Sequence, residues 1–207
     1  MVCHRGAPSA FLWSVRDPTE KPIVDGLRRG DRAAFEAAYK RFRARVYAFL
    51  LRLAGRRDVA EDLLQETWLR LARASPSLAE DTDLAAWLFT VARNQHVSWR
   101  RWSALDLSRL VALGEDTASP ATTAPPDVAT DAARAMRHLE LAIAQLPAAH
   151  REVLLLVGVE GFDQEQASAI LGVRYDALRQ RLARARAQLA KALEKLERVG
   201  PEPVGAR

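Results

Sequence analysis

The stretch from Leu146 to Leu196, LPAAHREVLLLVGVEGFDQEQASAILGVRYDALRQRLARARAQLAKALEKL, decides how the rest of the chain can be interpreted. It contains a short helical segment (Asp163–Leu171), a three-residue turn that begins with Gly172, and a long helix rich in arginine. Two helices joined by a tight turn with glycine form the pattern of a helix-turn-helix. The second helix of such a unit can lie in the major groove of DNA.

The apolar residues of this second helix fall on one stripe when each residue advances the helix by about 100°. They are Leu178, Leu182, Ala185, Leu189, Leu193 and Leu196. The opposite face consists of Asp176, Gln180, Ala183 and Ala187, and the arginines that flank the stripe are long enough to reach phosphates. The charge alone fits a solvated basic helix equally well. The turn and the short helix before it favour contact with DNA.

The composition is that of an ordinary globular protein with one large or two small domains, because 49% of the 207 residues are hydrophobic and 28% are charged. No apolar run approaches the roughly 20 residues that span a membrane, and no secretory signal is evident. The single cysteine, Cys3, excludes an internal disulfide and fits a reducing cytoplasm. The net charge of +5 favours a polyanionic partner, although arginine-rich composition also reflects GC-rich genomes. We therefore expect a cytoplasmic protein without membrane insertion.

Helical patterns recur along the chain, and no strand pattern competes with them. The first predicted helix follows a plausible N-cap, Asp31, and extends to Ala54. Its apolar seam consists of Phe35, Tyr39, Phe42, Val46, Leu50 and Leu53. Residues 103–130 change in composition and include a proline-containing acidic segment that is typical of a linker.

These patterns predict an all-α fold with two small helical domains joined by a flexible linker, the C-terminal domain containing the helix-turn-helix. The predicted boundaries give a mobile N-terminal arm at 1–25 and a helical domain at 26–103. They also give the flexible acidic linker at 104–130, the helix-turn-helix domain at 131–198 and a disordered tail at 199–207.

A second predicted helix, from about Asp58 to Ala74, carries an acidic face. Its inward side is Ala60, Leu64, Thr67, Trp68 and Leu71, and its opposite side is Asp58, Glu61, Asp62, Gln65 and Leu69. Carboxylates in the first turns stabilise a helix through its dipole. The same face, with an exposed leucine beside the carboxylates, also suits docking to another protein. Periodicity alone leaves both interpretations open.

A third predicted helix follows Asp83 as its N-cap and extends from about Leu84 to Trp102. Its second half interleaves cations, amides and tryptophans: Arg93, Asn94, Gln95, His96, Trp99, Arg100, Arg101 and Trp102. This mixture suits melted nucleic acid, because bases stack on aromatic rings while arginines meet phosphates. A core helix that packs its tryptophans inside fits equally well.

No arrangement of residues in the sequence indicates enzyme chemistry. The chain has no phosphate-binding loop, no glycine-rich dinucleotide turn and no histidine or cysteine cluster with metal-ligand spacing. Its carboxylates do not converge on an evident pocket. We therefore predict a protein that is not an enzyme, with no catalytic residues, no cofactor and no metal.

Taken together, these motifs resemble bacterial RNA polymerase sigma factors of the extracytoplasmic-function (ECF) group. The resemblance covers about residues 28–102 and 131–196. Three segments carry it: DVAEDLLQETWLR at 58–70, AWLFTVARN at 86–94, and the helix-turn-helix stretch with LP at 146–147 and RLARAR at 181–186. Their order and spacing around the linker make the resemblance more specific than any single segment.

The resemblance implies three binding surfaces. The acidic helix is implied to dock on the coiled coil of the largest subunit of core RNA polymerase, through Asp58, Glu61, Asp62, Gln65, Glu66 and Leu69. The loop at 74–83 and the helix after it are implied to read and open the −10 promoter element, with Arg93, Asn94, Trp99, Arg100 and Arg101 as contacts. The helix-turn-helix is implied to read the −35 element through Arg174, Asp176, Ala177, Gln180, Arg181 and Arg184.

The implied partners are therefore core RNA polymerase, including its flap region, promoter DNA and an anti-sigma factor. The alternative is a sigma-like decoy that binds an anti-sigma factor without recognising a promoter. The sequence departs from the family's pattern at Ser98, where an aspartate is usual, at Ala167 and Ser168 in the first helix of the motif, and at Arg174, Asp176 and Ala177. These departures bear on the −35 sequence preference more than on the DNA-binding role.

Overall fold

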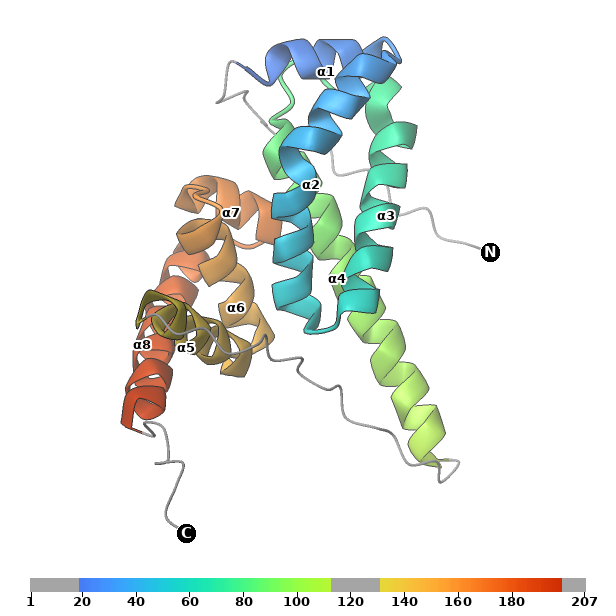
Figure 1. Ribbon diagram of the computed structural model, residues 1–207. Helices are drawn as coiled ribbons and strands as arrows, with labels where there is room; N and C mark the ends of the chain where they lie inside the picture. Colours follow the sequence, from blue (N-terminus) through green and yellow to red (C-terminus); the bar gives the residue numbers. More distant parts are fainter. Residues whose placement is uncertain (1–18, 113–130, 199–207) are drawn as a thin grey trace. The chain divides into compact units, whose positions relative to one another are not determined.

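The computed structural model describes residues 19–112 and 131–198, and every regular element within these two ranges is helical. The described chain divides into two compact units (Figure 1). The first contains α1, α3, α4 and α2 as far as Leu50, and the second contains residues 51–57 with α5 to α8. The predicted all-α fold with two helical parts is confirmed. The predicted linker from 113 onward and the tail lie outside the described residues.

Four α-helices and one short 3₁₀ helix form the first unit. They are α1 (Lys21–Arg28), α2 (Arg32–Ala54), α3 (Arg57–Ala74), the 3₁₀ helix η1 (Ser75–Ser77) and α4 (Leu84–Ala112). In Figure 1, α2 and α3 run side by side in opposite directions. The core of the unit is aliphatic and aromatic, and its fully buried side chains include Phe42, Val46, Phe49, Leu71, Leu88 and Phe89. Phe49 and Phe89 meet edge to face, with ring centroids 5.1 Å apart.

Helix α2 begins and ends where the sequence predicts. The Asp31 carboxylate accepts a hydrogen bond from the backbone N–H of Ala33 at 2.8 Å, and Gly55 after the last turn has a φ of 70°. Tyr39, one residue of its apolar seam, is 37% exposed, and its ring packs on Trp68 of the neighbouring helix.

The folded region begins earlier than the predicted N-terminal arm allows. Helix α1 starts at Lys21, with Pro22 at a position where its fixed φ favours helix initiation, and it buries Val24 and Leu27. At Gly26 a Cβ atom would lie 2.5 Å from the Ala34 Cβ atom, so the backbone of α1 lies directly against α2. The boundary at residue 25 is therefore wrong for residues 21–25.

Helix α4 also exceeds its prediction, because it continues to Ala112 instead of ending at Trp102. Residues 103–112, SALDLSRLVA, contain no glycine or proline that would stop a helix, and the first such residue is Gly114. The predicted linker range from 104 to 112 is therefore helical. At its other end, α4 begins after Asp83, whose carboxylate accepts from the Ala86 N–H at 2.8 Å as predicted.

A second carboxylate lies at the start of α4. Glu20, which precedes α1 and is only 4% exposed, accepts hydrogen bonds from the backbone N–H groups of Leu84 and Ala85. Burial raises the pKa of the Glu20 carboxyl, and nearby Asp83 raises this pKa further. The two backbone donors and the Arg41 guanidinium act in the opposite direction. Because the pKa is raised on folding, the folded chain holds this proton more tightly than the unfolded chain does.

The second unit consists of α5 (Asp131–Gln145), α6 (Ala148–Leu154), the π-helix η2 (Leu155–Val159), α7 (Gln164–Leu171) and α8 (Tyr175–Arg198). Helix α8 packs against α5, α6 and α7. The end of α5 is fixed by Arg151, whose guanidinium donates to the carbonyl oxygens of Ile143 at 3.2 Å, of Leu146 at 3.1 Å and of Ala144.

The helix-turn-helix has the geometry that its sequence predicts. Asp163 accepts from the Gln166 N–H at 2.8 Å, and the Gln166 side chain accepts from the Asp163 N–H at 3.1 Å, which forms a capping box at the start of α7. Gly172 ends α7 with a φ of 63°, a conformation that favours glycine. Ala167 is fully buried, so the small residue packs within the core. This capped α7 fixes the direction in which α8 leaves the turn.

We expect that the difference in melting temperature between the wild-type chain and Glu20→Gln changes with pH. As the pH falls from neutral through the raised pKa of Glu20, the wild type gains stability relative to Glu20→Gln, because protonation removes the cost of burying a charge. Calorimetry across this pH range measures the difference, and Glu36→Gln on the exposed side of α2 is the control. A difference that does not vary with pH would contradict the raised pKa.

A second prediction concerns the capping box. Asp163→Ala removes the acceptor for the Gln166 N–H and destabilises α7 by about 1 kcal/mol, whereas Asp163→Asn retains an acceptor. Hydrogen exchange of the α7 amides is expected to accelerate in the alanine variant and to change less in the asparagine variant. Equal protection in all three chains would show that the box does not stabilise the motif.

Candidate functional site

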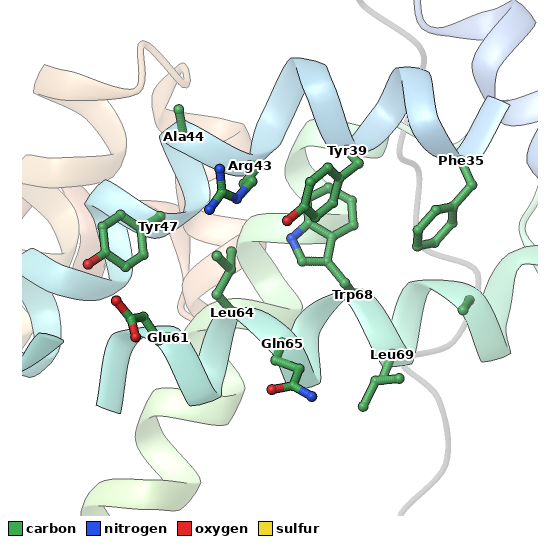
Figure 2. Close-up of a pocket in the computed structure, with 11 residues that line it drawn as sticks. Phe35, Tyr39, Arg43, Ala44, Tyr47, Glu61, Leu64, Gln65, Trp68 and Leu69 are labelled. Atoms are coloured by element: carbon green, nitrogen blue, oxygen red, sulfur yellow. The ribbon is translucent and has the colours of Figure 1, made fainter. Parts of the chain in front are cut away.

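A pocket lies between α2 and α3, within the first unit. It has a volume of about 860 Å³ and is lined by Phe35, Tyr39, Arg43, Ala44, Tyr47, Glu61, Leu64, Gln65, Trp68, Leu69 and Ala72. Figure 2 shows the Tyr39 ring over the Trp68 indole, with Tyr47 and Glu61 toward one end of the pocket and Phe35 toward the other. We refer to this pocket below as the α2–α3 groove.

Aromatic rings build the floor and wall of the α2–α3 groove. The centroids of Tyr39 and Trp68 are 4.9 Å apart with the rings tilted by 59°, and Phe35 meets Trp68 edge-on at 6.0 Å. The Arg43 guanidinium lies 5.7 Å from the centroid of the Tyr39 ring, within the range of a cation–π contact. The Trp68 indole N–H is buried and has no hydrogen-bond partner among the described residues. The groove therefore offers an aromatic surface bordered by the polar side chains of Arg43, Glu61 and Gln65.

The acidic face predicted for the polymerase contact borders this groove. Asp58, Glu61, Asp62 and Gln65 are exposed, and Leu69 is 43% exposed. Glu61, Gln65 and Leu69 also line the groove. Glu66 differs from the others because it is partly buried and forms an ion pair with Arg70 at 3.2 Å. The face thus combines carboxylates and an exposed leucine with an adjacent aromatic pocket.

The residues that α2 contributes to the groove were missed by the sequence analysis. Phe35, Tyr39, Arg43 and Tyr47 recur at four-residue intervals, which places them on one side of α2. Phe35 and Tyr39 were assigned to the predicted apolar seam. The side of α2 that they share with Arg43 and Tyr47 was therefore not recognised. The same four-residue interval separates Glu61, Gln65 and Leu69 on α3. The matching intervals on the two helices were the signal in the sequence from which the groove could have been predicted.

The residues predicted to contact −10 DNA lie along α4 and differ in exposure. Asn94, Arg100 and Arg101 are exposed, while Arg93 is half-buried and donates from Nη1 to the side-chain Oδ1 of Asn94 at 3.3 Å. A seven-residue separation puts Asn94 and Arg101 on the same side of the helix. This side presents an amide together with a cation, which can bind a base edge and a phosphate.

The two tryptophans on this part of α4 have different surroundings. Trp99 is half-buried, and its ring stacks on buried His96 with centroids 5.9 Å apart and an interplanar angle of 29°. Trp102, which was not among the predicted contacts, is 65% exposed, and Leu105 one turn later is also exposed. Exposed aromatic area on α4 is therefore concentrated at Trp102.

The residues predicted to read the −35 element share one side of α8. Arg174, Asp176, Ala177, Gln180 and Arg184 are exposed, and Arg181 is partly buried. At about 100° per residue these six positions fall within an arc of about 160°, which lies beside the stripe of buried Leu178, Leu182 and Ala185. The arc combines cations, an amide, a carboxylate and a small residue, which suits close approach to the edges of bases.

Tyr175 is an exposed aromatic residue that the sequence analysis did not single out. It is the first residue of α8, it is 44% exposed, and the Arg179 guanidinium lies 6.0 Å from the centroid of its ring. Both residues lie outside the arc defined above. They form a separate flank of the recognition helix.

Within residues 19–112 and 131–198, no helix is both long and apolar enough to cross a membrane. Among the same residues, histidine, cysteine, aspartate and glutamate form no group of three or more that could hold a metal ion.

Comparison with protein families assigns both helical parts of the chain. The sigma-70 region 2 family matches residues 38–104, which include most of α4 and every lining residue of the α2–α3 groove except Phe35. The sigma-70 region 4 family matches residues 136–189, which include the helix-turn-helix. The two matches follow each other in the order in which these regions are numbered.

Whole-chain comparison gives relatives of similar length. The chain is 37% identical over 177 residues to the RNA polymerase sigma factor CarQ of Myxococcus xanthus, covering 84% of this chain and 97% of that protein. It is 33% identical over 183 residues to the ECF RNA polymerase sigma factor EcfG of Rhodopseudomonas palustris, covering 87% of this chain and 93% of that protein.

Among solved structures, the sigma factor RpoE in complex with the anti-sigma factor NepR from Bartonella quintana is similar to this chain. The TM-score is 0.60 at 27% sequence identity, with coverage of 85% of this chain and 94% of that chain. Fold, family matches and whole-chain relatives therefore agree, and the chain belongs to the ECF group of RNA polymerase sigma factors.

Proposed function

We propose that this chain binds core RNA polymerase and directs it to promoters by reading the −35 element with α8 and the −10 element with the segment from Ala74 to Trp102. In this proposal the first unit has two roles, polymerase docking and −10 opening, and the second unit has one. The observation that carries the proposal is the exposed acidic face of α3 beside the α2–α3 groove, because a simple DNA-binding regulator needs no such surface.

The polymerase contact is supported by the chemistry of the α3 face. Glu61 and Asp62 lie near the start of the helix, where their charges are compatible with its dipole, and neither forms an ion pair with another of the described residues. Leu69 adds an exposed apolar group about two turns away. A basic partner helix with apolar residues on the same side matches this arrangement, and the coiled coil of the largest polymerase subunit is the partner that the family implies.

The −10 contact is supported by the combination of groups on α4. Exposed arginines and Asn94 can hold phosphates and base edges, and exposed Trp102 can stack on an unpaired base. Flipping a base out of the duplex costs a few kcal/mol, which stacking and amide contacts can recover. We add Trp102 to Arg93, Asn94, Trp99, Arg100 and Arg101 as a contact in this region.

The −35 contact is supported by the arc on α8. Its small residue Ala177 permits the helix to approach the major groove closely, while Gln180, Arg181 and Arg184 supply hydrogen-bond donors. The RpoE structure is a complex with an anti-sigma factor. We propose by analogy that a partner of the same kind controls the present chain.

The first test is transcription from genomic promoters by core polymerase with this chain. We expect promoter-specific run-off transcripts with the wild type and a loss of transcription with Asp62→Arg, because the reversed charge repels the basic partner. Glu36→Arg, the same charge reversal at an exposed carboxylate of α2 outside the groove, is the matched control and retains activity. Absence of any promoter-specific transcript with the wild type favours the decoy alternative, and normal transcription with Asp62→Arg contradicts the docking face.

A separate test addresses the recognition helix. Arg181→Ala and Arg184→Ala are each expected to weaken −35 binding by about 1–3 kcal/mol if the residue reads a base. Arg179→Ala, on the same helix but outside the arc, has a smaller effect. Footprinting of holoenzyme on a promoter measures the binding to the −35 element. A −35 footprint that is unchanged when both Arg181 and Arg184 are replaced would show that α8 has only a structural role.

A further inference from the structure

Both ends of helix α1 contact the part of the chain that connects α3 to the first turn of α4. Glu20, at the start of α1, bonds to the first residues of α4, and Arg28, at the end of α1, pairs with Glu80 at 2.9 Å. Helix α1 also packs against η1, where this segment begins. We call residues 20–28 the α1 clip and residues 75–83 the connecting segment.

The contact at Glu20 satisfies backbone groups that α4 cannot satisfy itself. The first N–H groups of a helix have no partner within the helix. One oxygen of Glu20 lies 3.1 Å from the Leu84 nitrogen and 3.4 Å from the Ala85 nitrogen, and Asp83 accepts from Ala86 at 2.8 Å. Two of these three donors therefore depend on a carboxylate that lies more than 60 positions earlier in the sequence.

The α1 clip is itself attached to α2. The Arg41 guanidinium donates to the Thr19 hydroxyl at 2.8 Å, just before Glu20. At Gly26 the α1 backbone lies so close to Ala34 that a Cβ atom would not fit without movement. Because the α1 clip is attached to α2, it holds the connecting segment in a fixed position relative to α2. Helix α2 also forms one wall of the α2–α3 groove.

The formation of α4 does not require the α1 clip. Asp83 caps the helix from within its own segment, and Leu84, Leu88 and Phe89 are fully buried in the core. The connecting segment has its own local hydrogen bonds, from the Ser75 hydroxyl to the Leu71 carbonyl and from the Thr82 hydroxyl to the Ala79 carbonyl. What the clip adds is a fixed position for the connecting segment and for the first turn of α4.

We propose that the α1 clip positions the connecting segment for promoter opening, with Glu20 as the positioning residue and the Arg28–Glu80 pair as its second anchor. This inference rests on the proposed function, which assigns the connecting segment and α4 to the −10 element. Glu20 acts through the backbone of Leu84 and Ala85 and touches no DNA. Its loss reduces opening of duplex DNA while the polymerase-docking face stays intact.

The test uses full-length chain assembled with core polymerase and compares three variants. Glu20→Met keeps the volume of the buried side chain and removes both acceptor oxygens, Glu20→Gln keeps one acceptor, and Asp25→Asn on the same helix is the matched control. For each holoenzyme, permanganate reactivity of the −10 region is measured on duplex promoter and on the same promoter with a pre-opened −10 region.

We expect Glu20→Met to lower opening of the duplex roughly tenfold, the size of effect that one lost hydrogen bond to a charged group produces. Binding to the pre-opened template and binding to core polymerase remain near the wild-type level. Glu20→Gln lies between Glu20→Met and the wild type, and Asp25→Asn equals the wild type. Equal losses on duplex and pre-opened templates, or unchanged opening by Glu20→Met, would overturn the proposal.

The second anchor gives an independent check through charge exchange. Arg28→Glu places two carboxylates together and reduces duplex opening, and the double variant Arg28→Glu with Glu80→Arg restores the pair and the opening. A double variant that is no better than Arg28→Glu counts against the proposal.

The failure of the proposed function and the failure of the α1 clip give different results. If the wild type itself gives no promoter-specific opening, the proposed function fails. If the wild type opens promoters and Glu20→Met opens them equally well, only the α1 clip is refuted.

Discussion

The N–H groups at the start of a helix have no partners within that helix, and this chain supplies carboxylates to them at several of its helices. Asp31 supplies an acceptor for α2, Asp83 and Glu20 for α4, and Asp163 for α7. Each carboxylate fixes the residue at which a helix begins and so fixes the rotation of every side chain along it. The side of α2 that faces the α2–α3 groove and the side of α4 that carries Asn94 and Arg101 both depend on this rotation. The capped α7 determines where α8 starts.

Three of these caps are local, Asp31, Asp83 and Asp163, and local chemistry explains why much of the fold follows from sequence alone. Asp31 and Asp163 stand just before helical apolar patterns, and Asp163 has Gln166 three residues later to complete the box. The two sides of α3 were separable for a similar reason, since one helical period sorts Leu64, Trp68 and Leu71 from Glu61 and Asp62. Periodicity left two interpretations of the acidic side of α3 open, helix stabilisation through the dipole and docking to another protein. The family resemblance then favoured docking.

Other features depend on contacts that no short window of sequence contains. Glu20 falls in a segment that its prolines made look like an arm, and its importance follows from a partner on α4. Tyr39 fits an apolar seam by spacing, yet its exposure is decided by Trp68 on another helix. The extension of α4 to Ala112 is a different case, because the absence of a stop signal was visible and the change in composition was given more weight. The site residues on α4 and α8 could be placed on a helix face from sequence, but their relative exposure could not.

The position of Trp68 in the α2–α3 groove has an optical consequence. Its indole is enclosed by Tyr39 and Phe35, and its N–H group has no hydrogen-bond partner among the described residues. Indole emission responds to the polarity and hydrogen bonding around the ring, so a molecule that enters the groove alters the emission of this residue directly. The chain thus carries an intrinsic fluorophore, one of its five tryptophans, at the surface proposed for polymerase docking.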